Sequence, residues 1–325
     1  QTAIEALGNI GDERGIPCVV EALSSTDKEV RKSAVLAMEN MTRKLDELHA
    51  IIQQPSTYRS LFRSACSEQI LQSLIELTKE KDANLVTAAI KLLGWSGCQA
   101  AAAVLLEKLG EEQFLETAVN ALIHIGDDAI GPLAGSYETS KSLEKRQLII
   151  YCLREVGGEQ ALRLFLEYLQ ESEEELLTYA LLKSLTEPPG ISLLLADKQA
   201  QPPKYFETVV MYAKQYLKSL HPLVRAEAVD LWGQLLGMHA LDDILNATKD
   251  ADPSVRVKAI KHLGEFAKSD QELTQHLIIL LSDDHPNIRK QAAISLGNSE
   301  SAAAFPALLL VLDDLNAIVW RAAVT

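Results

Sequence analysis

The sequence predicts an all-α fold, an α-solenoid of about ten stacked helical hairpins. Its 325 residues exceed what one compact core usually holds, so either several domains or a repeat array is expected. Ala and Leu are abundant and aromatic residues make up only 5%, which suits closely packed helices better than strands. One apolar pattern also recurs about every 31 residues, a period that is typical of solenoids.

The repeat is defined on the segment DPSVRVKAIKHLGEF, with Arg256 taken as position 0. Position −1 is then Val255, +3 is Ala259, +7 is Leu263 and +8 is Gly264. The same frame fits at nine places, whose zero positions are Arg31, Val86, Leu115, Arg146, Leu177, Arg225, Arg256, Arg289 and Trp320. A tenth copy begins one period before the first. We therefore expect residues 1–325 to form a single solenoid, and a fragment of a longer chain, because both ends fall inside a repeat.

Each unit is predicted to be a helical hairpin. Positions −1, +3, +4 and +7 fall on one side of a helix, so this stripe should be buried. Asp252 and Pro253 form an N-cap and first-turn pair. Glycines that follow the helix, as in LGNIGDERGIP, supply the turn into a second apolar helix such as QELTQHLIILL at residues 271–281.

Two steps, of 55 and 48 residues, are longer than the period and predict insertions near 42–66 and 187–203. The first is expected to be either an extended hairpin or a degenerate repeat. The second contains the proline pairs Pro188–Pro189 and Pro202–Pro203, so it is expected to leave the helical path as a loop.

The segment LGNIGDERGIPCVVEALSSTDKEVRKSAVLAM at residues 7–38 resembles the HEAT-like repeats of the phycobilisome-lyase type, part of the wider HEAT-repeat family. The resemblance extends over nearly the whole chain and is strongest near both ends. In that family an Asp in the turn often pairs with the Arg at position 0. The resemblance thus implies an Asp–Arg ladder made of Asp250 with Arg256 and Asp283 with Arg289. The ladder should be incomplete, because Ser25, Ser140 and Ser219 replace the Asp in three other copies.

The charge and cysteine content restrict the function. A formal net charge of −14 repels nucleic acids and anionic membrane surfaces, and no apolar run approaches the length of a membrane span. The cysteines Cys18, Cys66, Cys98 and Cys152 form no C-x-x-C pair. We expect buried, reduced thiols in a cytoplasmic protein that binds neither nucleic acid nor membrane.

No catalytic, cofactor or metal motif is present. None of the seven histidines pairs with another His or a carboxylate in a ligand motif, such as those of HEAT-type di-iron hydroxylases. His221 and His285 precede a proline and are expected to be helix N-cap residues. The sequence contains no nucleophile elbow, phosphate-binding loop or dinucleotide fingerprint. The protein is therefore predicted to be no enzyme and to need no cofactor or metal.

Positions +1, +2 and +5 lie opposite the buried stripe, and the HEAT resemblance implies that this outward face lines a concave side. In the middle copies these positions hold an apolar and aromatic patch, Leu148, Tyr151, Tyr179 and Leu182, and in other copies the lysines Lys91, Lys258 and Lys261. Patches of this kind commonly bind proteins. The alternative is that the middle repeats are rotated and these residues pack internally.

The leading functional prediction is a protein–protein interaction scaffold that presents its concave helical surface to another protein. The alternative that the resemblance implies is a phycobilin lyase-like factor for chromophore attachment. A third hypothesis, a HEAT-like DNA-binding glycosylase, needs a basic track that this acidic chain does not offer.

Overall fold

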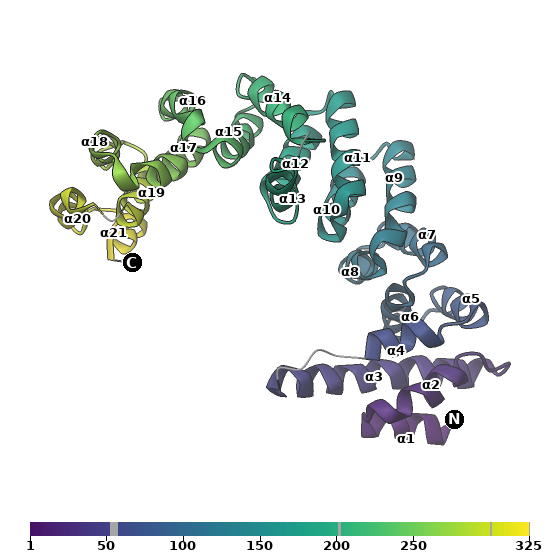
Figure 1. Ribbon diagram of the computed structural model, residues 1–325. Coiled ribbons are helices and arrows are strands. Elements are labelled where there is room, and N and C mark those ends of the chain that lie inside the picture. Colours follow the sequence, from purple (N-terminus) through teal and green to yellow (C-terminus); the bar gives the residue numbers. More distant parts are fainter. Residues whose placement is uncertain (53–57, 201–202, 300, 325) are drawn as a thin grey trace. The chain divides into compact units, whose positions relative to one another are not determined.

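The computed structural model describes residues 1–52, 58–200, 203–299 and 301–324, and within those ranges the regular structure is entirely helical (Figure 1). The chain divides into two compact units, Gln1–Val156 and Gly157–Thr325. The helix of each repeat that carries the frame defined above is called its frame helix. The predicted all-α class is confirmed.

The first unit contains five frame helices, each followed by a second helix or a turn. Its helices are α1 (Thr2–Ile10), α2 (Ile16–Ala22), α3 (Lys28–Ile52), α4 (Tyr58–Ala65), α5 (Glu68–Leu77), α6 (Ala83–Ser96), α7 (Gln99–Lys108), α8 (Leu115–Ile125), α9 (Ile130–Thr139) and α10 (Leu143–Val156). The frame helices α1, α3, α6, α8 and α10 pack against one another in chain order.

The second unit repeats this arrangement. Its helices are α11 (Gly158–Glu171), α12 (Glu175–Thr186), α13 (Gly190–Asp197), α14 (Phe206–Tyr216), α15 (Pro222–Leu236), α16 (Leu241–Ala247), α17 (Pro253–Phe266), α18 (Gln271–Leu280), α19 (Pro286–Asn298), α20 (Phe305–Val311) and α21 (Ala317–Val324). The frame helices α12, α15, α17, α19 and α21 pack in chain order. The predicted stripe is buried: in α17, Val255, Ala259, Ile260 and Leu263 are at most 1% exposed.

Glycines at two frame positions do different work. Gly11 and Gly126, at +11, have φ angles of 74° and 77° and form the predicted turns. Glycine at +8 instead lies inside the helix and touches the next frame helix. A Cβ on Gly94 would stand 2.6 Å from Cα of Ala121, and one on Gly233 would stand 2.5 Å from Cγ of His262. The missing side chain at +8 thus sets how closely consecutive repeats approach.

The predicted ladder pairs each aspartate with the arginine six residues later, but the aspartate carboxylates bind the arginine of the preceding repeat instead. Nη1 of Arg256 and Nη1 of Arg289 donate to the main-chain oxygens of Asp250 and Asp283, each at 2.9 Å, rather than to the carboxylates. The carboxylates face the preceding repeat. Arg225 donates twice to Asp250, at 2.9 and 2.8 Å, and Nη2 of Arg256 lies 3.6 Å from Asp283. Each arginine therefore joins its own turn to the turn of the next repeat.

The serines at the same position explain why the ladder has gaps. Oγ of Ser25 and Oγ of Ser219 each accept the main-chain N–H two residues later at 3.2 Å, as the Asp250 carboxylate does at 2.9 Å. Arg31 and Arg225 still donate to the serine main-chain oxygens, at 3.0 and 2.9 Å. Serine keeps the turn and gives up only the ion pair with the preceding repeat.

The insertions are both built from helix. The first lengthens α3 and adds α4, which packs between α2 and α6; its residues 53–57 lie outside the described ranges. The expectation of a loop is wrong at residues 190–197, because Gly190–Asp197 forms α13; residues 201–202, which include Pro202, lie outside the described ranges. Pro188 and Pro189 precede that helix, where proline removes no helical hydrogen bond. The Asp197 carboxylate then accepts the N–H groups of Tyr205 and Phe206, at 2.6 and 2.7 Å, which closes the connection to α14.

Smaller expectations have mixed outcomes. His221 and His285 are N-cap residues as predicted, and Nδ1 of His285 accepts the N–H of Asn287 at 3.3 Å. Of the four cysteines, which are all unpaired thiols, only Cys152 is buried. The expectation of buried thiols is wrong for Cys18, which is exposed on the short helix α2.

A candidate binding cleft in the first unit

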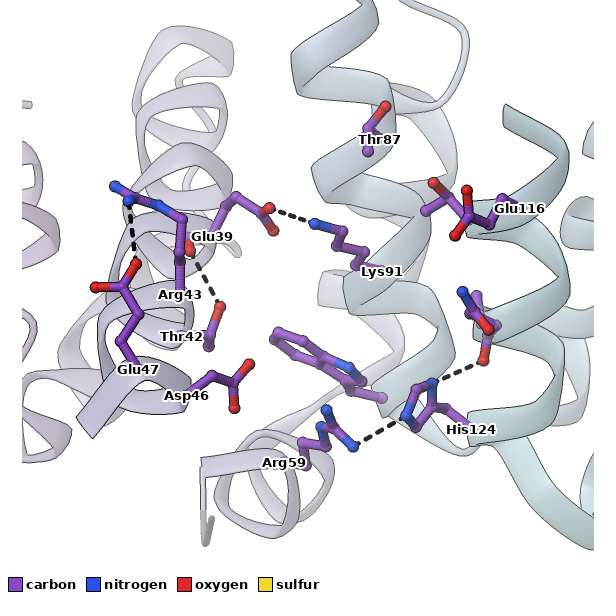
Figure 2. Close-up of a pocket in the computed structure, with 14 residues that line it drawn as sticks. Glu39, Thr42, Arg43, Asp46, Glu47, Arg59, Thr87, Lys91, Glu116 and His124 are labelled. Carbon is purple, nitrogen blue, oxygen red and sulfur yellow. Dashed lines mark hydrogen bonds and ion pairs between the residues drawn. The ribbon is translucent and has the colours of Figure 1, made fainter. Parts of the chain in front are cut away.

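A cleft of about 590 Å³ lies between the frame helices α3, α6 and α8, with α4 at one end (Figure 2). Its lining residues are Glu39, Thr42, Arg43, Asp46, Glu47, Arg59, Thr87, Lys91, Trp95, Glu116, Thr117, Asn120, Ala121 and His124. The outward positions +1 or +2 and +5 of two copies supply Thr87, Lys91, Glu116, Thr117 and Asn120. The prediction that these positions face outward holds for these five residues and is wrong for Ala88 at +2, which is 1% exposed.

The first insertion shapes one end of the cleft. Tyr58 and Phe62 of α4 meet the indole of Trp95 edge-on, with ring centroids 5.3 and 6.2 Å apart. The Tyr58 hydroxyl donates to the Asp46 carboxylate on the extended part of α3 at 2.6 Å. Burial, together with this hydrogen bond, raises the pKa of Tyr58 to about 12, so the hydroxyl stays a donor. A helix that ordinary repeats lack therefore ties α3 to α6.

Most charges on the walls are matched within the cleft. Lys91 forms an ion pair with Glu39 across the gap between α6 and α3 (Figure 2). Nη1 of Arg43 lies 3.5 Å from Glu47 one turn along α3. Both pairs are partly or largely exposed, so each contributes at most about 1 kcal/mol to stability. Lys91, which the sequence analysis assigned to partner binding, is thus inside the cleft and already paired.

Arg59 pairs with a histidine and not with a carboxylate. Its Nη1 lies 2.9 Å from Nε2 of His124, and Nδ1 of His124 lies 2.7 Å from the main-chain oxygen of Asn120. A carbonyl can only accept, so Nδ1 carries the proton and Nε2 accepts from Arg59. Burial and the charge of Arg59 lower the pKa of His124, which favours this neutral form. Among the residues that the structure describes, no carboxylate lies within ion-pair distance of Arg59.

Leu148, Tyr151, Tyr179 and Leu182, which the sequence predicts to form an exposed central patch, are not all exposed. Tyr151 on α10 is 42% exposed, and Leu148 is half-buried. In the second unit Tyr179 is half-buried, whereas Leu182 is 0% exposed. The assignment of Leu182 to an exposed patch is wrong, because α12 packs against α11, α13 and α15 and its position +5 is covered.

The outward positions of the Arg225 and Arg256 copies form a buried charge cluster. Asp230, which is 4% exposed, accepts hydrogen bonds from Nζ of Lys258 at 2.5 Å, Nζ of Lys261 at 3.4 Å and Nε2 of His262 at 2.7 Å. Glu227 lies 3.4 Å from Lys258. The expectation that these positions face outward is wrong for Glu227 and Asp230, because the lysine chains of the next repeat lie across them, whereas Lys261 itself stays exposed.

The cluster perturbs the pKa values of its members. Burial by itself would raise the pKa of Asp230, but hydrogen bonds from His262 and Lys258 hold it well below its usual range. For His262, burial by itself would lower the pKa, because it disfavours the charged imidazolium. The hydrogen bond with Asp230 instead raises the pKa of His262 above its ordinary value. The lysines predicted to bind a partner, Lys258 and Lys261, serve instead to neutralise a buried carboxylate.

Two features were missed in the sequence although signals for them existed. The cleft depends on the first insertion, because α4 brings Tyr58 and Phe62 to Trp95. The sequence signal for it was the long spacing of 55 residues between the Arg31 and Val86 copies. The cluster depends on opposite charges that stand 31 residues apart, since Glu227 precedes Lys258 and Asp230 precedes Lys261 by one repeat. Charges compared between neighbouring copies, and not within one helix, would have revealed the pairing.

Comparisons with known proteins support the fold. A family model described as HEAT repeats matches residues 1–67 and 241–325, and no curated protein matches the chain. The karyopherin Kap121p, in crystal structures with the extreme C-terminus of the protein phosphatase Cdc14p and with the SUMO protease Ulp1p, superposes with a TM-score of 0.58 at 16% identity. Each match covers 96% of this chain and 37% of the karyopherin.

A crystal structure of an engineered protein covers 99% of this chain and 92% of its own, at 18% identity and a TM-score of 0.41. In the described ranges no helix is both long and apolar enough to cross a bilayer, and no group of three His, Cys, Asp or Glu is placed to hold a metal ion. The matched model is that of HEAT repeats in general, and the phycobilisome-lyase type stays a prediction. The chain is an all-α solenoid of HEAT-like hairpins, and the HEAT-repeat family model matches both of its ends.

Proposed function

We propose that the protein is a non-catalytic protein-interaction scaffold and that the cleft of the first unit binds a segment of a partner protein. The observation that carries the proposal is the cleft itself, about 590 Å³ in volume and shaped by α4, the helix that the first insertion adds. Threonine and asparagine side chains on its walls can hydrogen-bond a main chain, and charged groups at its ends can select side chains.

The structural relatives support this kind of function by analogy. Kap121p, which shares the fold, is bound to the extreme C-terminus of the protein phosphatase Cdc14p in one crystal structure and to the SUMO protease Ulp1p in the other. Fold analogy alone does not identify a partner. Leu148, Tyr151 and Tyr179 remain candidates for further contact, with Tyr151 as the most exposed of the three.

No specific observation favours the other two hypotheses. A DNA-binding surface would need free lysines, whereas Lys258 and Lys261 are held by Asp230. Chromophore attachment stays an implication of the sequence resemblance. The scaffold proposal includes a cytoplasmic location and a protein partner.

Site-specific photo-crosslinking tests the proposal. A benzophenone amino acid is placed at Thr87 or Thr117 in the cleft, and at Glu107 on α7 as an exposed control away from it. We expect the two cleft positions to crosslink the same protein in extracts of the source cells and Glu107 to crosslink none. Equal labelling from all three positions, or none from the cleft, would contradict the proposal.

A further inference from the structure

We infer that the cleft holds an extended peptide that carries an acidic side chain bound by Arg59 and a basic side chain bound by Glu116. This inference rests on the proposed function and names the chemistry of the partner. It follows from two wall charges, Arg59 and Glu116, that have no ion-pair partner among the described residues, and from the distance between them. Asp46, a third such charge, already accepts the hydrogen bond of the Tyr58 hydroxyl.

Arg59 has the capacity to bind a carboxylate. A guanidinium offers five N–H donors in a planar fork, and the described contacts of Arg59 with other side chains use one, to His124. Its Cζ lies 5.9 Å from the centroid of Trp95 and 5.6 Å from that of Tyr58, so two aromatic rings support the group. A supported guanidinium matches a carboxylate through two parallel hydrogen bonds.

The neutral state of His124 makes Arg59 available. Nε2 of His124 satisfies one N–H of Arg59 but leaves its positive charge uncompensated. In a chain of net charge −14, an uncompensated cation in a cleft is unusual and marks where a partner can supply the missing anion. The remaining cations on the walls, Arg43 and Lys91, have Glu47 and Glu39 for that purpose.

Glu116 supplies the second anchor. In the part of the chain that the structure describes, its carboxylate has no ion-pair partner, and it stands near the start of α8, whereas His124 stands near its end (Figure 2). Eight residues of helix span about 12 Å. An extended peptide covers that distance in three or four residues, at about 3.3 Å each.

The expected ligand is therefore specific in its pattern. It carries Asp or Glu and, three or four positions away, Lys or Arg. Between these anchors its main chain passes Thr117 and Asn120, whose side chains line the same wall. Because the two anchors have opposite charges, the acidic field of the whole protein neither excludes nor requires such a peptide.

Selection from a displayed library of random twelve-residue peptides tests the inference on the full chain. The wild type should enrich peptides with an acid and a base three or four positions apart. Arg59→Gln should weaken the best peptide about tenfold or more and abolish the acidic preference, while Glu116→Gln should abolish the basic one. Arg43→Gln, which changes a paired arginine of the same cleft, should stay within about twofold.

A charge reversal keeps the test decisive. Arg59 is exposed, so the Arg59→Glu variant should fold, and circular dichroism checks that it does. This variant should select peptides with a basic residue at the position where the wild type selects an acidic one. Enriched peptides without this pattern, or with affinities that do not change in Arg59→Gln, would overturn the inference and leave the crosslinking result of the scaffold intact. Failure to enrich any peptide would also overturn it.

Discussion

The same frame positions form an open cleft in the first unit and a closed charge cluster in the second. In the first unit, positions +1 and +5 of α6 and +1, +2 and +5 of α8 line an open cleft, and Glu116 and Asn120 are exposed. In the second unit, the same positions of α15 and α17 form a cluster in which Glu227 and Asp230 are at most 5% exposed. Both units have a close +8 glycine contact between these helices, so helix spacing does not explain the difference.

Charge complementarity between consecutive repeats explains it instead. In the second unit, two acids of one repeat form ion pairs with two lysines of the next repeat. The lysine side chains cover the acids, and this part of the outward face contributes to stability. Where consecutive repeats carry short polar side chains and unmatched charges, the face stays open. An outward face is therefore free to bind a partner where the neighbouring repeat does not pair with its charged side chains.

The largest expected effect comes from removal of the central carboxylate of the cluster. Asp230→Ala leaves Lys258, Lys261 and His262 without their shared partner, and should lower the free energy of unfolding of the second unit by about 2–4 kcal/mol, since the lysines can still reach water. Denaturant unfolding measures it. The matched change in the first unit, Glu39→Ala, should cost at most about 1 kcal/mol, because its pair with Lys91 is partly exposed. Equal losses would contradict the distinction between the units.

Glycine at +8 comes next. Gly233→Ala would place a Cβ 2.5 Å from the ring of His262, so the substitution should destabilise the second unit by about 1–3 kcal/mol. Gly297 occupies the same frame position with open space around it, and Gly297→Ala should instead stabilise by up to about 1 kcal/mol. Thermal unfolding of both variants separates a packing effect from helix propensity. Destabilisation by both would show that packing against the next helix is not the reason for glycine.

The arginine ladder has a smaller effect. Arg225→Lys loses the two-bond pair with Asp250 and the bonds to two main-chain oxygens, and should cost about 1–2 kcal/mol. Arg256 lies 3.6 Å from its carboxylate, so Arg256→Lys should cost less. The comparison uses chemical denaturation under the same conditions. A larger loss at Arg256 would contradict the ranking by geometry.

The smallest effects are those of pH near neutrality, where the histidines of the two units, His262 and His124, act with opposite signs. The raised pKa of His262 means that its contribution is fully present below its ordinary pKa of 6.5 and is lost as pH rises through the folded-state value. The lowered pKa of Asp230 means that its contribution is present above the ordinary 3.8 and is lost as pH falls below it. For the lowered pKa of His124, stability should increase as pH rises toward 6.5.

Amide hydrogen exchange, corrected for the intrinsic effect of pH, can follow each unit separately. Between pH 6 and pH 8 we expect α15 and α17 to lose protection while α8 does not. His262→Asn should remove the loss in the second unit. Unchanged protection of α15 and α17 in the wild type would argue against a histidine that is charged at pH 6.

The fold was predictable because the same buried stripe recurs in every copy of the repeat. The stripe at −1, +3, +4 and +7 and the turn glycines such as Gly11 are local features, and the structure confirms them. The direction of the Asp250 ladder was not predictable from spacing, because an arginine can reach either a main-chain oxygen of its own turn or a carboxylate of the neighbouring repeat. Pro188 and Pro189 misled because proline is compatible with a helix start as well as with a loop.

The candidate site was predictable only in part. Positions on an isolated helix indicate which residues face away from the core, and Lys91, which was expected to face outward, lies on the wall of the cleft. They do not indicate what a neighbouring helix covers, so Leu182 and Asp230 were expected outside and lie inside. Arg59 had no signal of its own, because its role depends on where α4 brings it relative to Trp95 and His124.

The most direct test of the central claim places one crosslinker at the same frame position of both units. Asn120 and Lys261 both occupy +5, and the side chain of Lys261 is 47% exposed, so both are accessible to a partner. A benzophenone amino acid at position 120 should crosslink a partner protein, while the same amino acid at position 261 should not. Crosslinking from position 261 alone, or equally from both, would contradict the account that the open face of the first unit is the one that binds.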